Sequence, residues 1–163
     1  MKCPKCGGEM RQKEEYILYD YKTSGSYKIA NALGLTKEAP HLRDWELQIN
    51  NYRIMLEALS FKITRQVVQA TARDGGLASS KRLGITRKIN VIEIQRLDDD
   101  DVVNYFASKN SALQDALKDG VMPPMCDYEE RWANRKCSGY CTVVDYCPEG
   151  LKMKGVKGEN PSG

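Results

Sequence analysis

Asp20, Tyr21 and Lys22 place a carboxylate and an ammonium two positions apart at the end of an apolar stretch. Residues 16 to 22 are mostly aromatic or aliphatic, which is typical of a strand. Because side chains alternate along a strand, we expect Asp20 and Lys22 on one face and Tyr21 on the other. A carboxylate can bind a hard divalent cation, and a neighbouring ammonium can orient water or stabilise a developing anion. A strand that simply ends in polar residues can contain the same triplet. Other parts of the chain must therefore show whether this one is catalytic.

A second pair of polar residues lies on the clearest helix that the sequence predicts, at about residues 41 to 59. Gln48 and Tyr52 are four residues apart on this helix and therefore share one of its faces. Taken alone, such a pair is more typical of the border between core and solvent than of a catalytic site. The helix itself is predicted from apolar residues at helical spacing, namely Leu42, Trp45, Ile49, Leu56 and Leu59.

The six cysteines lie only near the two ends of the chain, and in a reducing compartment they favour metal binding over disulfides. The first pair, Cys3 and Cys6, forms a Cys-Pro-x-Cys-Gly knuckle, which is half of a zinc-ribbon site. No second half follows closely, so the pair either meets distant cysteines in space or binds no ion. The other four have the spacing C-x10-C-x3-C-x5-C, which fits tetrahedral zinc or a cubane iron–sulfur cluster: Cys126, Cys137, Cys141 and Cys147.

The elements that must position these residues alternate between strands and helices. We expect a hairpin of residues 9 to 12 and 16 to 22, which would place Glu9 beside Asp20. The aspartates at 98 to 101 resemble a metal site, but acids at the start of a helix are the more typical interpretation. The remaining expected elements are a helix at 27 to 34, a strand at 61 to 72, a basic loop at 77 to 88, a strand at 89 to 94 and a helix from 98 to about 118.

The bulk composition predicts a soluble globular protein of 163 residues, with 41% hydrophobic and 29% charged residues and a net charge of +3. No apolar run is long enough for a membrane span and the start does not resemble a signal peptide, so we expect a cytoplasmic protein. The predicted divisions are a cysteine knuckle at 1 to 8, a core at 9 to 120, a cysteine module at 121 to 150 and a disordered tail at 151 to 163.

Taken in order, these motifs resemble the RecB-like branch of the PD-(D/E)xK nucleases. That branch includes the CRISPR-adaptation exonuclease and phage exonucleases, and many members end in three cysteines that help to bind an iron–sulfur cluster. The resemblance covers about residues 8 to 148 and rests on Asp20 and Lys22, on Gln48 and Tyr52, and on Cys137, Cys141 and Cys147. It implies an α/β fold with a restriction-endonuclease-like core, a mixed sheet flanked by helices. The core would be short or N-terminally truncated, with a cysteine-rich C-terminal metal module.

The function that this resemblance implies is a metal-dependent DNA exonuclease acting on linear or single-stranded ends, with roles in DNA repair or recombination. Mg²⁺ or Mn²⁺ would be held by Glu9, Asp20 and the Tyr21 carbonyl. Lys22 would orient the attacking water or stabilise the pentavalent phosphorane, and Gln48 and Tyr52 would help to position the DNA strand and the lysine. Cys126 would be the fourth ligand of a [4Fe-4S] cluster, with zinc as the alternative. Five basic residues could contact the phosphates of DNA, and an ordinary solvated loop is an equally good interpretation of them: Arg73, Lys81, Arg82, Arg87 and Lys88.

The chain also departs from the family pattern at three points. Glu9 stands where an aspartate is usual, the only histidine, His41, lies outside the family's upstream position, and three residues instead of two separate Cys137 from Cys141. Two other functions therefore stay open. One is a catalytically weak DNA-binding or assembly subunit of the same fold, and the other is a zinc-binding protein without nuclease activity. No membrane partner is expected, while protein partners and homo-oligomer formation are left open.

Overall fold

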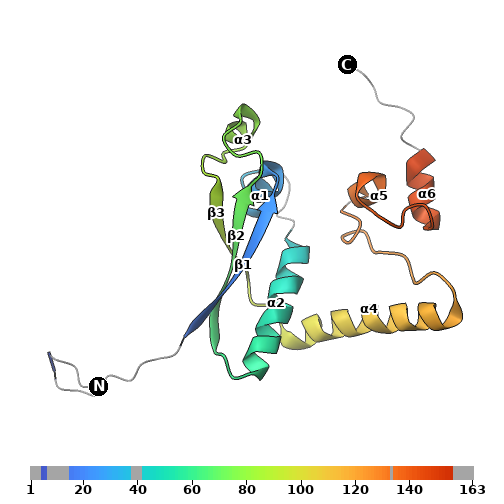
Figure 1. Ribbon diagram of the computed structural model, residues 1–163, viewed down its shortest axis with the longest axis horizontal. Coiled ribbons are helices and arrows are strands. Elements are labelled where there is room, and N and C mark those ends of the chain that lie inside the picture. Colours follow the sequence, from blue (N-terminus) through green and yellow to red (C-terminus); the bar gives the residue numbers. More distant parts are fainter. Residues whose placement is uncertain (1–4, 7–14, 38–41, 133, 156–163) are drawn as a thin grey trace. The chain divides into compact units, whose positions relative to one another are not determined.

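The computed structural model describes residues 5–6, 15–37, 42–132 and 134–155 (Figure 1). The chain divides into two compact units, Met1–Val102 and Val103–Gly163, which are treated separately below. The boundary falls inside a helix, whereas the sequence placed the end of the core near residue 120. Among the described residues, no helix combines the length and apolar character needed to cross a membrane.

Unit 1 is an α/β unit whose described strands form a small mixed sheet in the order β1-β2-β3. The strands are β1 (Tyr16–Ser24), β2 (Ile63–Ala72) and β3 (Ile89–Glu93), at the positions that their apolar patterns predict. β1 and β2 are parallel, and β2 and β3 are antiparallel. The predicted partner strand at residues 9 to 12 lies outside the described residues.

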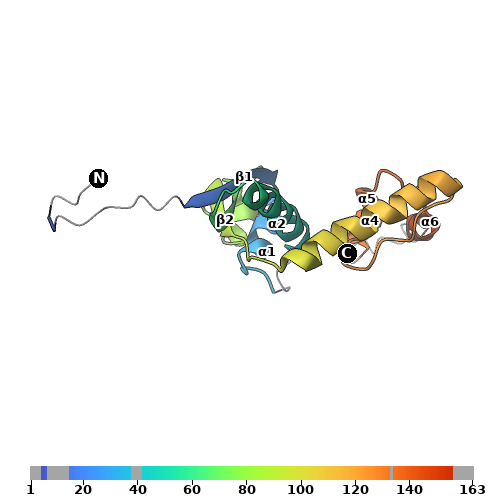
Figure 2. The ribbon, with the colours of Figure 1, turned by 90° about the horizontal axis from the view of Figure 1, so that it is seen from below.

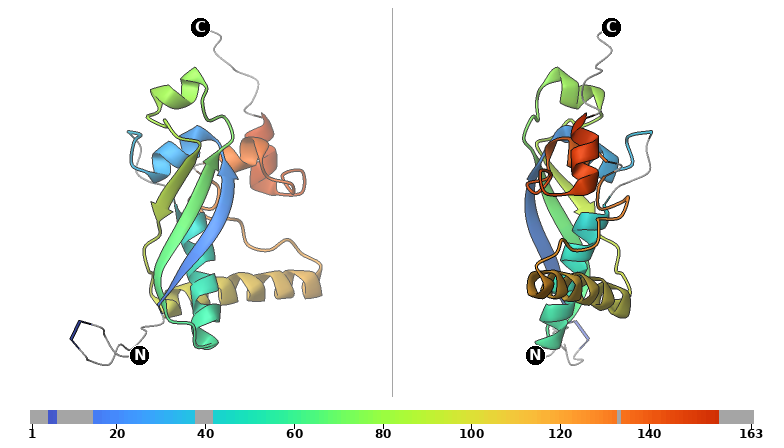
Figure 3. Two further views of the ribbon diagram at one scale, coloured as in Figure 1. Left: turned by 60° about the vertical axis from the view of Figure 1, so that its left-hand side comes forward. Right: turned by 90° about the vertical axis from the view of Figure 1, so that its right-hand side faces the viewer.

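Two helices connect the parallel strands, α1 (Ser26–Ala32) and α2 (Arg43–Ala58), close to the two predicted helices. Both pack on one face of the sheet, and the left-hand view of Figure 3 shows the strands in front of them. The core between the helices and the sheet is made of apolar side chains that are almost completely buried. Its members include Ile29, Trp45, Ile49, Val68, Ala70 and Ile92.

The loop predicted at residues 77 to 88 contains a short helix, α3 (Ala78–Arg82). Five residues are too few to show a helical period in the sequence, and the loop prediction was therefore wrong at this point. The residues that follow anchor the segment, because Ile85 is 1% exposed and belongs to the core of unit 1. Leu83 packs against the same core.

Helix α4 (Asp99–Asp119) starts as the acidic run predicts, and Figure 2 shows it as one continuous helix. Asp98 Oδ1 accepts hydrogen bonds from the backbone N–H groups of Asp100 and Asp101, so this carboxylate caps the helix. Unit 2 also contains α5 (Arg135–Gly139) and α6 (Pro148–Gly155). α6 carries helical structure to Gly155, five residues into the segment for which the sequence predicted disorder.

Candidate functional site

Strand β1 places Asp20 and Lys22 on the face of the sheet that α1 and α2 cover, with Leu18, which packs against the core. Tyr21 points the other way and is 72% exposed. The alternation expected from the sequence is therefore confirmed. The two charged side chains are 22% and 18% exposed, respectively, so they meet at the border between core and solvent.

The four residues singled out on β1 and α2 form one continuous chain of contacts. Lys22 Nζ lies 2.7 Å from Asp20 Oδ2 and donates a 2.6 Å hydrogen bond to Gln48 Oε1. Gln48 Nε2 in turn donates to the Tyr52 hydroxyl at 2.8 Å. The packing of α2 on the sheet thus brings the Gln-x3-Tyr pair to the lysine of the Asp-x-Lys triplet.

Asp20 keeps an acceptor atom that the described protein does not fully use. Its Oδ2 atom is buried and accepts no hydrogen bond within the described residues. The Lys22 ammonium compensates its charge at 2.7 Å but does not have the alignment of a hydrogen bond. A buried carboxylate oxygen is costly unless a cation or donor satisfies it, and the Lys22 ammonium is such a cation. A carboxylate oxygen is also a suitable ligand for a divalent cation.

The Tyr21 carbonyl, predicted as a further cation ligand, points away from β2. The Ser24 carbonyl accepts from the Arg73 N–H and the Tyr16 N–H donates to Lys62, so even-numbered residues of β1 face β2. Odd-numbered residues must then direct their backbone groups to the opposite edge of the strand. The Tyr21 carbonyl is consequently directed to the edge of β1 on which the predicted hairpin partner would pair.

The second acid of the predicted cation site, Glu9, lies outside the described residues, as does Cys3. Cys6 is described and exposed. Within the described part of the chain, no three Asp, Glu, His or Cys side chains converge closely enough to hold one metal ion. Asp20 is accordingly the one predicted carboxylate ligand that the described structure positions.

The five basic residues predicted to contact phosphates are exposed and lie around the connection between β2 and β3. The backbone N–H of Arg73 donates to Ser24 at the end of β1, two residues after Lys22. Arg73 therefore starts the connection beside the end of the strand that carries the Asp-x-Lys triplet. The others are Lys81 and Arg82 in the last turn of α3, and Arg87 and Lys88 just before β3.

Asp74 is a positioning residue that the sequence reasoning treated only as part of a turn. Its Oδ1 accepts from the Ser26 backbone N–H at 2.7 Å and from the Ser26 hydroxyl at 2.8 Å. The side-chain hydrogen bond from Ser26, followed by the backbone one, lowers the pKa of Asp74. Because β1 runs directly into α1, this bond fixes the strand end that follows Lys22. A carboxylate after a predicted strand was the only signal in the sequence.

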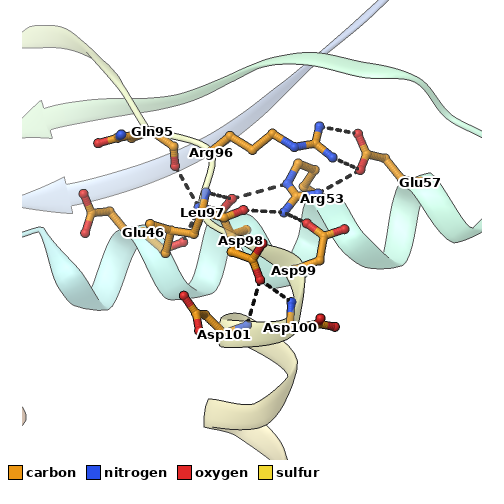
Figure 4. Close-up of polar contacts among 11 residues, drawn as sticks. Glu46, Arg53, Glu57, Gln95, Arg96, Leu97, Asp98, Asp99, Asp100 and Asp101 are labelled. Carbon is orange, nitrogen blue, oxygen red and sulfur yellow. Dashed lines mark hydrogen bonds and ion pairs between the residues drawn. The ribbon is translucent and has the colours of Figure 1, made fainter.

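Arg53 was also missed, although it is 0% exposed in α2. Its guanidinium donates to Glu57 at 2.8 Å, to Asp99 at 2.5 Å and to the Leu97 carbonyl at 3.2 Å (Figure 4). Glu57 also accepts from Arg96. Arg53 lies four residues after buried Ile49, and a charged residue at that core position was the signal available in the sequence.

In unit 2, all four C-terminal cysteines line one pocket of about 250 Å³, although no three of them are close enough to share one metal ion. Cys137 is buried, Cys141 and Cys147 are half-buried, and Cys126 is exposed. Arg131 and Lys136 also line the pocket and supply positive charge near the thiols. The described structure thus places four thiol groups around one pocket without bringing them together as a metal site.

Comparisons with protein-family models, with curated proteins and with solved structures find no match to this chain. The functional argument therefore depends on the site geometry described above.

Proposed function

We propose that the protein is a metal-dependent DNA exonuclease with a restriction-endonuclease-like core and a cysteine-bound iron–sulfur cluster. The observation that carries the proposal is the chain of contacts from Asp20 through Lys22 and Gln48 to Tyr52. The sequence resemblance assigns these four residues to one active site, and they come from two elements that are 26 residues apart at the Lys22–Gln48 contact.

The proposed reaction is hydrolysis of a phosphodiester bond. Water adds to phosphorus, the bond to the leaving ester oxygen breaks, and that oxygen takes up a proton. Asp20, Glu9 and the Tyr21 carbonyl would hold Mg²⁺ or Mn²⁺, which when bound supplies positive charge that activates water and offsets charge on the phosphate. Lys22 stabilises the negative charge that develops on the phosphate oxygens. Gln48 keeps the ammonium directed, and Tyr52 orients the Gln48 amide.

The basic residues of the β2–β3 connection would bind phosphates without regard to sequence. Arg73 is the best placed of them, because its backbone is bonded to the end of β1. The others lie on or after α3, where exposed side chains can follow a flexible strand. We expect their contribution to weaken steeply as the salt concentration rises.

The proposal of an iron–sulfur cluster rests on the resemblance of the cysteine run to that of the nuclease family. The four C-terminal cysteines line one pocket, but no three of them converge on one point among the described residues. Four thiolates would serve either a cubane cluster or tetrahedral zinc. Zinc stays the alternative, and metal analysis after anaerobic purification, with absorption near about 400 nm for iron, decides between them.

The test of the nuclease is Mn²⁺-dependent digestion of linear DNA. Wild type should degrade the DNA, while Asp20→Ala and Lys22→Ala should not. Lys28→Ala is the control, because Lys28 is bonded to Asp44 and lies outside the contact chain. Equal residual activity in wild type and both site variants would rule out this active site. DNA binding without cleavage would favour the second candidate, a DNA-binding subunit, which is supported by the single carboxylate that the described residues bring to Lys22.

A further inference from the structure

Helix α4 has one side that is mostly apolar and exposed, called here the α4 stripe. Its residues recur every three or four positions, which places them in one line along the helix. The four apolar members are between 37% and 71% exposed in the described structure. A continuous apolar surface of this kind is typical of an interaction site. The stripe consists of Val103, Phe106, Asn110, Leu113 and Leu117.

The rest of unit 2 packs on a different side of α4. The Tyr105 hydroxyl donates a 2.8 Å hydrogen bond to Glu130, and Lys109 Nζ lies 2.6 Å from the same carboxylate. Ala116, on the same side of the helix, is 7% exposed. This side lies about 100° around the helix axis from the α4 stripe. The contacts that hold unit 2 together therefore leave the stripe accessible to a partner.

The residue at the centre of the α4 stripe is polar, and this favours a second copy of the same helix as the partner. Phe106 and Leu113 lie on either side of Asn110, and Val103 and Leu117 lie seven residues from it in opposite directions. The stripe is therefore almost symmetric about Asn110. A two-fold axis at this point brings the two asparagine amides together, and each can donate to and accept from the other. One asparagine in an apolar helix seam is a known means of fixing the register of a helix pair.

The charges near the two ends of α4 favour an antiparallel pair. Asp100 and Lys118 are eighteen residues apart, or about five helical turns, so they lie on one side of the helix, next to the stripe. Within the described part of the chain, neither side chain forms an ion pair. In an antiparallel pair centred on Asn110, Lys118 of one copy lies within about 3 Å, measured along the axis, of Asp100 of the other. A parallel pair would instead bring together the two acidic first turns, Asp99–Asp101.

We propose that α4 pairs antiparallel with α4 of a second copy of the chain, around a two-fold axis at Asn110. The stripe is about 21 Å long from Val103 to Leu117, and it is smaller than a standard interface of roughly 800 Å² per partner. The association is therefore weak, with a dissociation constant on the order of micromolar. Pairing of the helices needs neither metal nor DNA, so it is independent of the proposed nuclease activity.

Sedimentation velocity of the full chain, from about 1 to about 100 µM, tests the proposal. Wild type should change from monomer to dimer within this range. Leu113→Glu introduces two charges into the apolar seam of each dimer and should raise the dissociation constant by about tenfold or more. Asn104→Glu is the matched control, because Asn104 is exposed on the side of α4 away from the stripe and should associate like wild type.

Charge reversal tests the direction of the pair. Asp100→Lys and Lys118→Glu should each raise the dissociation constant by about tenfold, because each makes two attractive pairs repulsive. The double variant restores both pairs with the charges exchanged and should associate like wild type. A wild type that stays monomeric, or equal losses in Leu113→Glu and Asn104→Glu, would overturn the proposal. A double variant that associates as weakly as the single ones would overturn it as well.

Discussion

Lys22 has two neighbours that act on its ammonium in different ways. Asp20, at 2.7 Å, compensates the charge, while the neutral amide oxygen of Gln48, at 2.6 Å, fixes the direction of the side chain. Gln48 is itself oriented by its 2.8 Å bond to the Tyr52 hydroxyl. A free lysine side chain has about 2 kcal/mol of rotamer entropy to lose. In this arrangement much of that entropy is already lost before a substrate binds, which is the preorganisation that electrostatic catalysis requires.

The Gln48→Leu substitution should lower kcat by about tenfold or more, with a smaller change in KM. It removes the neutral acceptor that the described residues give to the Lys22 ammonium, and one hydrogen bond to a charged group is worth about 1.5 kcal/mol or more. Tyr52→Phe is a milder variant, because it removes only the hydroxyl that orients Gln48. We expect it to lower kcat by about threefold. Steady-state cleavage of a labelled DNA strand measures both. An unchanged kcat in Gln48→Leu would show that the bond does not position Lys22.

Local periodicity predicted each half of this site but not their contact. Alternation along β1 placed Asp20 and Lys22 on one face, and i, i+4 spacing placed Gln48 with Tyr52. The Lys22–Gln48 bond spans 26 residues and depends on how α2 packs against the sheet, which no single-element pattern contains. The resemblance to a nuclease family supplied that link. The buried acceptor on Asp20 could not be predicted at all, because it depends on the positions of the surrounding atoms.

At the scale of elements, Arg53 connects α2, the segment after β3 and the start of α4 through hydrogen bonds. Its guanidinium joins α2 to the Leu97 carbonyl and to Asp99 in the first turn of α4. Asn50, one turn earlier on α2, donates to the Gln95 carbonyl and accepts from the Leu97 N–H. The connection from β3 to α4 is therefore hydrogen-bonded to α2. Its stability depends on a buried cation with several acceptors around it.

Arg53→Met should destabilise unit 1 by about 3 kcal/mol. The substitution leaves the part-buried Leu97 carbonyl without its Arg53 donor, and the shorter side chain fills the buried Arg53 position less fully. Arg96→Met is the matched control: Arg96 also binds Glu57, but its side chain is 53% exposed, and we expect a loss below about 1 kcal/mol. Urea unfolding followed by Trp45 fluorescence measures both, with Trp132 replaced by Phe. Equal losses in the two variants would show that burial of Arg53 does not matter.

The same cluster predicts an acid-sensitive contact. The hydrogen bond from Arg53, with its positive charge, lowers the pKa of Asp99, and burial only partly opposes the shift. Since the folded pKa lies below the unfolded value near about 3.9, the stabilisation is complete above that pH and is lost as the pH falls through the folded value. Stability measured by urea unfolding should therefore fall below about pH 4 more steeply in wild type than in Asp99→Asn. Asp100→Asn, one residue further on, should behave like wild type.

At the scale of the whole molecule, the two units differ in how much apolar surface they bury. Unit 1 has a continuous core between the sheet and its helices. In unit 2 the buried apolar side chains among the described residues are few, namely Ala116, Cys137 and Val144, while large ones such as Leu117 and Tyr146 are 71% and 75% exposed. A unit with so small a core needs another source of folding free energy. The cysteine pocket can supply it, because binding of a metal group to thiolates is coupled to folding.

If the proposed cluster is bound, its removal should unfold the cysteine module and leave unit 1 folded. Chelation of the metal after oxidation of the cluster, or the double substitution Cys137→Ser and Cys141→Ser, would take away the thiolate–metal cross-links that the proposed cluster supplies to the segment from Cys126 to Cys147. Hydrogen exchange followed by mass spectrometry should show loss of protection in peptides of residues 126 to 147, while peptides of β2 keep theirs. Cys6→Ser is the control, because Cys6 is exposed and belongs to unit 1. Undiminished protection of α5 in the double variant would mean that this module folds without a metal group, and loss of protection in both units would mean that they do not fold separately.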